Sequence, residues 1–128
     1  MHTTRRALAD RLSEYGKPVE IGVGRRPDVA AALADGGASV TTTDIHRFDV
    51  PDGVRFVRDD VTDPEFDVYA DADVVYALNC PPELQRPLRT VASGVGAECL
   101  FTTLGGDPAV VEATPEQLPG ETLFHVKP

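Results

Sequence analysis

The sequence predicts a three-layer α/β/α sandwich around a mainly parallel sheet, and three observations lead to this fold class. Short apolar runs alternate with helical patterns along all 128 residues, without linker or repeat, which is typical of one α/β domain spanning 1–128. Residues 74–78 are apolar, as expected of a strand buried on both faces. A strand, then Gly22 and Gly24, then a helix start follow one another. Right-handed crossovers predict the strand order 3-2-1-4-5, with 122–126 as an edge strand beyond the fifth.

A helix is predicted at the start of the chain. Thr3 or Thr4 can cap it, because a side-chain oxygen can accept a hydrogen bond from the free N–H groups of the first turn. Leu8, Leu12 and Tyr15 are spaced as one apolar stripe, which carries the helix to about Tyr15.

The first strand is predicted at 19–23, and a second helix follows it. Pro27 suits the first position of that helix, since its fixed φ is helical and its missing N–H is not needed there. Val29 and Leu33 form an inner face, and Gly36–Gly37 end the helix.

The second and third strands are predicted close together. The β-branched segment 38–43 predicts the second strand, which ends at Asp44, and 54–57 predicts the third. The connection 45–53 is shorter than the dozen or so residues that a crossover between parallel strands normally needs. The helix is therefore expected to be reduced to a turn or lost here.

The last elements begin with a fourth strand at 73–78. The spacing of apolar residues predicts a helix over 81–95, in which Pro87 should cause a kink or mark the true start. A fifth strand is predicted at 97–103, and a weak helical turn near 108–113 precedes the last strand.

The chain is strongly acidic, with 12 Lys+Arg against 21 Asp+Glu and a net charge of −9. Such a surface repels phosphate backbones and anionic lipid, which argues against nucleic-acid and membrane-surface partners. Asp outnumbers Glu 13 to 8 and only two basic residues are lysines, a pattern that favours a salt-adapted, halophilic host. No apolar run approaches the roughly 20 residues that span a bilayer. With only Cys80 and Cys99, a reducing cytoplasm is expected.

The glycine turn after the first strand is the candidate ligand site. The missing side chains of Gly22 and Gly24 clear a path to backbone N–H groups before the second helix. Asp44 lies twenty residues beyond Gly24, at the end of the second strand, where a carboxylate can bind both hydroxyls of a ribose. A ligand with a ribose is therefore expected. The alternative is that the glycines serve only a tight turn.

The segment V-E-I-G-V-G at 19–24 resembles the first motif of class I S-adenosylmethionine-dependent methyltransferases, in which an acidic residue, here Glu20, precedes G-x-G by two positions. Arg26 stands where that pattern usually has a third glycine. The nicotinamide fingerprint would instead have an apolar residue in place of Glu20 and a glycine in place of Pro27, so NAD is the less favoured cofactor. The cofactor-binding residues that the resemblance implies are Glu20, Gly22, Gly24, Asp44 for the ribose and, from the pair Asp59-Asp60 after the third strand, Asp60 for the adenine amino group.

The loop after the fourth strand, N-C-P-P-E at 79–83, resembles the Asn-Pro-Pro-aromatic loop of methyltransferases that act on amide or ring nitrogen. The resemblance implies that Asn79 is the catalytic group that orients an acceptor. Cys80 is inserted and Glu83 replaces the aromatic residue, so the alternative is that the prolines only end the strand. Histidines and cysteines show no metal-ligand spacing, and no metal is expected.

The whole chain more closely resembles a small, uncharacterised family of archaeal proteins with a shortened methyltransferase-like, Rossmann-like fold. Three functions are considered: a methyltransferase, a module that binds S-adenosylmethionine or another adenosine ligand without catalysis, and a degenerate scaffold for interactions. The retained glycines and carboxylates argue against the scaffold, and the short loops and altered Pro-Pro motif argue against the methyltransferase. We therefore expect a protein that binds S-adenosylmethionine or another adenosine ligand, with methyltransferase activity left open. The sequence predicts no oligomeric state.

Overall fold

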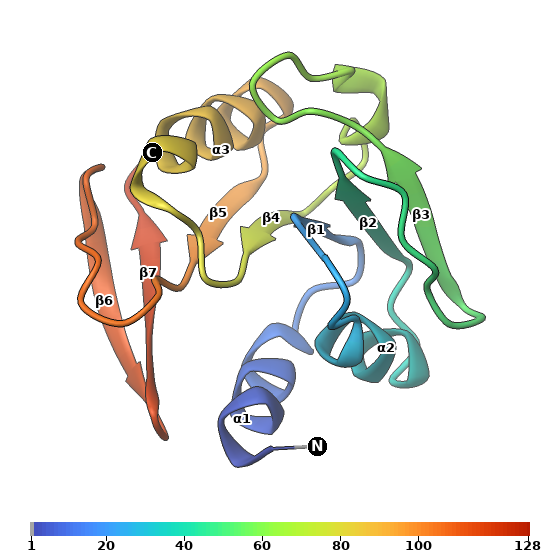
Figure 1. The fold of residues 1–128 in the computed structure, drawn as a ribbon, viewed down its shortest axis with the longest axis horizontal. Coiled ribbons are helices and arrows are strands. Elements are labelled where there is room, and N and C mark those ends of the chain that lie inside the picture. Colours follow the sequence, from blue (N-terminus) through green and yellow to red (C-terminus); the bar gives the residue numbers. More distant parts are fainter. Residues whose placement is uncertain (1) are drawn as a thin grey trace.

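The computed structural model describes residues 2–128, which form one seven-stranded sheet with helices on both faces (Figure 1). The strands are β1 (Pro18–Ile21), β2 (Val40–Asp44), β3 (Val54–Arg58), β4 (Val74–Ala77), β5 (Glu98–Phe101), β6 (Ala113–Leu118) and β7 (Glu121–Val126). The helices are α1 (Thr3–Leu12), α2 (Asp28–Asp35) and α3 (Pro82–Val95), with a short 3-10 turn, η1 (Phe66–Val68). Within the described part of the chain, no helix is long and apolar enough to cross a membrane.

The strand order is β3-β2-β1-β4-β5-β7-β6, so the predicted order 3-2-1-4-5 is confirmed. Strands β1 to β5 are parallel, and β7 is antiparallel to both of its neighbours, β5 and β6. The last strand lies next to the fifth, as predicted, but β6 lies outside it and forms the edge of the sheet.

Two apolar layers hold the helices on the sheet. In Figure 1, α1 and α2 lie below the row of strands and α3 lies above it. Consecutive residues of β4 alternate between the two layers: Val74 and Tyr76 pack with α1 and α2, and Val75 packs with α3. Burial on both faces is the reason that this strand is apolar throughout, as the sequence analysis expected.

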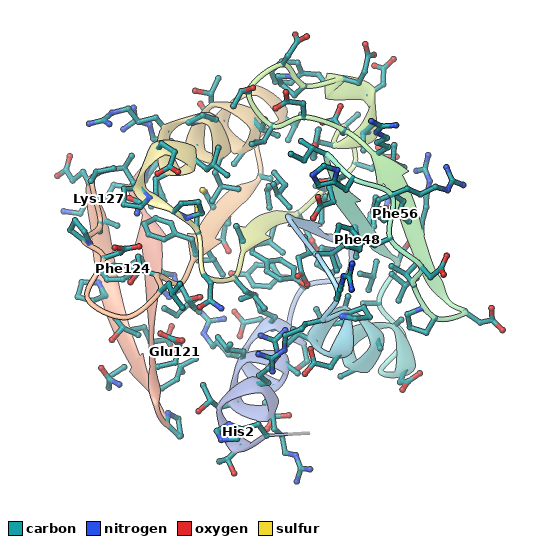
Figure 2. The ribbon with its side chains drawn as sticks, in the orientation of Figure 1. His2, Phe48, Phe56, Glu121, Phe124 and Lys127 are labelled. Atoms are coloured by element: carbon teal, nitrogen blue, oxygen red, sulfur yellow. The ribbon has the colours of Figure 1, made fainter. Side chains whose placement is uncertain are left out.

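The first helix begins and ends differently from the prediction. Its cap is His2, whose Nδ1 accepts a hydrogen bond from the N–H of Thr4 at 3.2 Å, and neither Thr3 nor Thr4 is the cap (Figure 2). The helix ends at Leu12, where Ser13 caps it, and not near Tyr15. The ring nitrogen of His2 serves the free N–H as a threonine hydroxyl would, but histidine is not among the residues by which N-caps are recognised.

The segment before the last strand is also a correction, because residues 108–113 form no helical turn. They run as an irregular segment into β6, which pairs along its whole length with β7. β6 has the sequence A-T-P-E-Q-L and includes Pro115, which an edge strand tolerates because one side of its backbone needs no partner. Its mostly polar residues show none of the apolar alternation by which strands are predicted.

The connections around β3 are shortened. No helix joins β2 to β3, which confirms the expectation for 45–53, and only η1 stands between β3 and β4. Pro82 begins α3, and Pro87 lies within the helix rather than at its start. The fold is a Rossmann-like sandwich in which three α-helices pack on a seven-stranded sheet.

The stability of the protein is expected to rise with salt. Ion pairs among residues 2–128 engage Glu14, Asp28, Glu112 and Glu116, so most of the 21 acidic side chains have no cationic partner. Screening by KCl relieves the repulsion among them. Between 0.1 M and molar KCl the midpoint of thermal unfolding should rise by roughly 5 °C, which corresponds to about 1 kcal/mol. A midpoint that stays constant or falls would contradict salt adaptation.

Candidate functional site

The glycine turn after β1 folds over the end of β2. The N–H groups of Gly22 and Val23 both donate to the carbonyl oxygen of Thr43, at 2.9 and 3.1 Å. Gly22 and Gly24 have left-handed backbone angles, with φ of 76° and 58°, which other residues rarely adopt. A Cβ atom at either position would meet no atom within 4 Å. The turn therefore needs glycine for its conformation, and its glycine positions face open space. The expected path to free backbone N–H groups is wrong, however, because the N–H groups of Gly22 and Val23 bind Thr43 and that of Gly24 binds Asp44.

Asp44 lies directly against this turn. Its Oδ2 accepts a hydrogen bond from the N–H of Gly24 at 3.0 Å, and its Oδ1 accepts one from the N–H of His46 at 3.1 Å. The spacing of twenty residues that pointed to this pair thus corresponds to a direct contact. Each carboxylate oxygen can accept a second hydrogen bond, so the half-buried carboxylate retains capacity for hydroxyl donors.

The pair Asp59-Asp60 divides into a structural residue and an exposed one. Asp59 holds its loop in place, accepting from the N–H of Glu65 at 3.1 Å and from the hydroxyl of Tyr69. The N–H of Asp59 also donates to the carbonyl of Asp44 at 3.1 Å, which joins the two loops.

Asp60 presents its carboxylate to solvent. Its Oδ1 accepts from the hydroxyl and the N–H of Thr62, at 2.7 and 2.9 Å, and these bonds lower the pKa of Asp60. Its Oδ2 has no hydrogen-bond partner among residues 2–128. Asp60 is therefore ionised at neutral pH with one free acceptor, on the loop next to Asp44.

Glu20 lies apart from the exposed surface that the glycine turn and Asp44 form. Its side chain is 1% exposed and its Oε1 accepts a hydrogen bond from the hydroxyl of Tyr76 at 2.8 Å. Burial raises the pKa of Glu20 to about 7, although the Tyr76 hydrogen bond and the charge of Arg5 oppose the change. Since Val19 and Ile21 belong to the layer under α3, Glu20 points toward α1 and α2. The structure thus places it beneath the turn and not on its surface.

The loop after β4 has a special backbone at Asn79. Its φ is 53°, the left-handed region, and no other non-glycine residue in the described chain adopts it. The N–H of Asn79 donates to Oγ1 of Thr102 at 2.8 Å, and that of Cys80 donates to the Thr102 carbonyl at 2.7 Å. Asn79 is exposed, whereas Cys80 is buried and its pKa is raised to about 11, mainly by burial. Burial and the raised pKa argue against the thiol as a nucleophile, and Asn79 is the exposed polar side chain that follows β4.

Ile45 is a candidate site residue that was not predicted from the sequence. It follows Asp44, is 53% exposed, and its carbonyl accepts a hydrogen bond from Nε of Arg58 at 2.9 Å. One signal in the sequence could have indicated it: a large apolar residue stands in a loop, directly after the carboxylate that ends a strand. Together Asp44 and Ile45 offer acceptors for hydroxyl groups and an apolar surface for a flat ring.

The ends of four neighbouring parallel strands bring most of the predicted residues to one edge of the sheet. Gly22 and Gly24 follow β1, and Asp44 is the last residue of β2. Asp60 follows β3 and Asn79 follows β4, so these residues gather at this edge, whereas Glu20 lies within β1. The described residues include no group of three His, Cys, Asp or Glu side chains that could hold a metal ion. A cavity of about 970 Å³ lies at the opposite edge, between the end of α3, the start of β5 and the end of β7, and is separate from this site.

The comparison with protein families matches residues 3–125 to UPF0146, described as an uncharacterised protein family. This chain belongs to the UPF0146 family. A UPF0146 protein of the archaeon Halobacterium salinarum is 63% identical over 104 residues, which cover 81% of each chain. The resemblance to a small archaeal family is therefore confirmed.

Solved methyltransferase structures share the fold of this UPF0146 chain. An RNA methyltransferase from Salinibacter ruber, in complex with S-adenosyl-L-homocysteine, superposes with a TM-score of 0.62 at 18% identity, covering 95% of this chain and 86% of its own. The S-adenosylmethionine-dependent methyltransferase SibL, in its apo form, superposes with a TM-score of 0.66 at 16% identity over 98% of this chain. This UPF0146 chain spans 55% of SibL. At these identities the likeness shows a methyltransferase-like fold.

Proposed function

We propose that this UPF0146 protein binds an adenosine ligand, in the first place S-adenosylmethionine, at the edge formed by the glycine turn and Asp44. The observation that carries the proposal is the 3.0 Å hydrogen bond between the Gly24 N–H and the Asp44 carboxylate. It brings a carboxylate with free acceptor capacity to a turn that no side chain covers. The two ribose hydroxyls are donors that suit this carboxylate.

The base has a matching surface next to the ribose position. Ile45 provides an exposed apolar side chain, and Asp60 provides a free, ionised Oδ2 on the adjoining loop. An adenine ring would pack on Ile45 and donate its amino hydrogen to Asp60. A base with a carbonyl oxygen in place of that amino group would meet the Asp60 carboxylate with no proton to donate, so adenine is preferred.

The start of α2 favours S-adenosylmethionine over a dinucleotide. A pyrophosphate would need free N–H groups and a positive helix end at this place. Pro27 lacks an N–H, and the Asp28 carboxylate stands in the first turn of α2. Pro27 removes a donor that a pyrophosphate would use, and Asp28, which is ion-paired with Arg5, adds no positive charge, whereas S-adenosylmethionine has no phosphate and needs neither. The complex of the Salinibacter methyltransferase with S-adenosyl-L-homocysteine supports the same choice.

Methyl transfer is a finer step that our proposal does not require. If the protein transfers a methyl group, Asn79 is the residue to orient the acceptor, since it follows β4, the neighbour of β1. Glu83 in place of an aromatic residue provides no ring to stack on a planar acceptor. We therefore propose ligand binding, in the cytoplasm, as the function.

Calorimetric titration in molar KCl with S-adenosylmethionine, S-adenosylhomocysteine and NAD tests the proposal. We expect saturable binding of the first two and none of NAD. If no adenosine ligand binds, the scaffold interpretation replaces the proposal. Transfer of labelled methyl groups from S-adenosylmethionine to a cell extract would add catalysis to binding.

Two alanine substitutions separate ligand contact from backbone strain. Gly22 and Gly96 have nearly equal φ values, 76° and 72°, and a Cβ at either would meet no atom within 4 Å. Alanine at each position should lower the free energy of unfolding by a similar amount, roughly 1 kcal/mol, because the left-handed region is strained for alanine. Only Gly22→Ala places a methyl group where the ligand approaches, and it should weaken binding at least about tenfold. Equal affinities of the two variants would remove the glycine turn from the site.

A further inference from the structure

A buried arginine of α1 reaches the turn from below. The side chain of Arg5 is 10% exposed, and its Nε donates to both carboxylate oxygens of Asp28, at 2.9 and 2.8 Å. Its Nη2 lies 2.7 Å from Oδ1 of the same carboxylate. Asp28 is the first residue of α2, so this pair joins the first helix to the start of the second.

The same guanidinium also holds the backbone of the turn. Nη2 of Arg5 donates to the carbonyl oxygen of Arg26 at 3.2 Å. The N–H of Arg26 in turn donates to the carbonyl oxygen of Val23, within the turn, at 3.4 Å. Arg5 thus contacts the last peptide of the turn and the first side chain of the helix. Arg26 is also the position at which the methyltransferase motif usually has a third glycine.

The ion pair is not the only contact that attaches α1 to α2. The two helices already share an apolar contact through Leu8, Leu12, Val29 and Leu33, each at most 2% exposed. A buried ion pair loses hydration that its attraction scarcely repays, and apolar replacements are often neutral in stability. The position of the pair, against the turn, therefore indicates a role in geometry.

We propose that Arg5 is a positioning residue for the ligand turn. By holding the Arg26 carbonyl and the Asp28 carboxylate together, it keeps the turn, with its hydrogen bonds to Thr43 and Asp44, in the conformation that places Asp44 for the ligand. The effect on affinity rests on the proposed function, whereas the effect on the turn does not.

Arg11 is a matched control on the same helix. Its Nε donates to both oxygens of Glu116 on the edge strand β6, at 3.0 and 3.1 Å, and its Nη1 donates to Glu14 at 2.6 Å. Arg5→Gln should weaken S-adenosylhomocysteine binding about tenfold relative to Arg11→Gln in calorimetry, and Arg5→Lys, which loses the planar fork, should resemble Arg5→Gln. Equal affinities of the Arg5 and Arg11 variants would overturn the proposal. If Arg5→Gln does not fold, Asp28→Asn is measured in its place.

Amide hydrogen exchange followed by NMR tests the turn without ligand. Gly22 and Val23 donate to Thr43 and should exchange about tenfold faster in Arg5→Gln than in Arg11→Gln, once rates are corrected for global stability. This measurement decides the proposal even if the wild-type protein binds no adenosine ligand. Unchanged exchange overturns it, including the case in which affinity falls, because Arg5 would then act by direct contact.

Discussion

Replacing Asp44 with alanine is expected to weaken S-adenosylmethionine binding by about 1.5–3 kcal/mol, the range for hydrogen bonds to a charged group. The dissociation constant should rise roughly 10- to 150-fold in calorimetry. The reason is the loss of the carboxylate that stands beside the Gly24 N–H and would accept both ribose hydroxyls. An unchanged dissociation constant would contradict the proposed ribose site.

Two further variants control for damage to the turn. Asp44→Asn retains one carbonyl oxygen as acceptor for the Gly24 or His46 N–H but loses the charge, so its affinity should lie between wild type and Asp44→Ala. Asp52 is exposed and precedes β3, at the opposite edge of the sheet. Asp52→Ala removes the same charge and should leave affinity unchanged, which separates local contact from the general effect of charge.

Replacing Glu20 with glutamine is expected to remove a pH dependence of stability. The pKa of Glu20 is raised from 4.5 to about 7, mainly by burial, so the folded protein holds a proton that the unfolded chain releases between these values. Wild-type stability should therefore fall by roughly 3 kcal/mol as pH rises from 4.5 to 7 through this group alone. Glutamine stays neutral and still accepts the Tyr76 hydrogen bond, so the variant should be the more stable protein at pH 8 and similar to wild type at pH 5.

Urea unfolding of both proteins from pH 4.5 to pH 8 measures this difference. The carboxyls whose pKa is lowered, Asp28, Asp60 and Glu116, lose their stabilising contribution as pH falls from about 4.5 downward, so they change the curve only at its acid end. Glu83→Gln, at an exposed glutamate, is the matched control and should parallel wild type. A Glu20→Gln curve parallel to wild type would show that Glu20 remains ionised in the folded protein.

The strand order could be predicted because its signals are local. The apolar character of β4 follows from burial on both faces, and β2 and β3, V-T-T-T-D and V-R-F-V-R, are marked as strands by their β-branched and aromatic residues. β6 carries no such signal, because its backbone pairs with β7 while its polar side chains face solvent. An edge strand of this composition is defined by its partner and not by its own residues.

The candidate site was predictable in part for the same reason. The spacing from Gly24 to Asp44 is a property of one strand-turn-helix-strand unit, and the two residues do form a hydrogen bond. Ile45 and Arg5 were not identified, because exposure in a loop and contact across 21 to 23 residues follow from packing. The choice between Asp59 and Asp60 also depends on packing, since Tyr69 engages only Asp59.

The sequence by itself determined the fold class, the order of the parallel strands and the glycine turn with its carboxylate, since apolar periodicity and residue spacing act over short distances along the chain. Only the tertiary structure decided that Glu20 is buried against Tyr76 and that Arg5, on α1, contacts the backbone of the turn. Burial and charge pairing arise when distant segments meet. The environment of a side chain, and hence its pKa and its role, therefore cannot be predicted from its neighbours in the sequence.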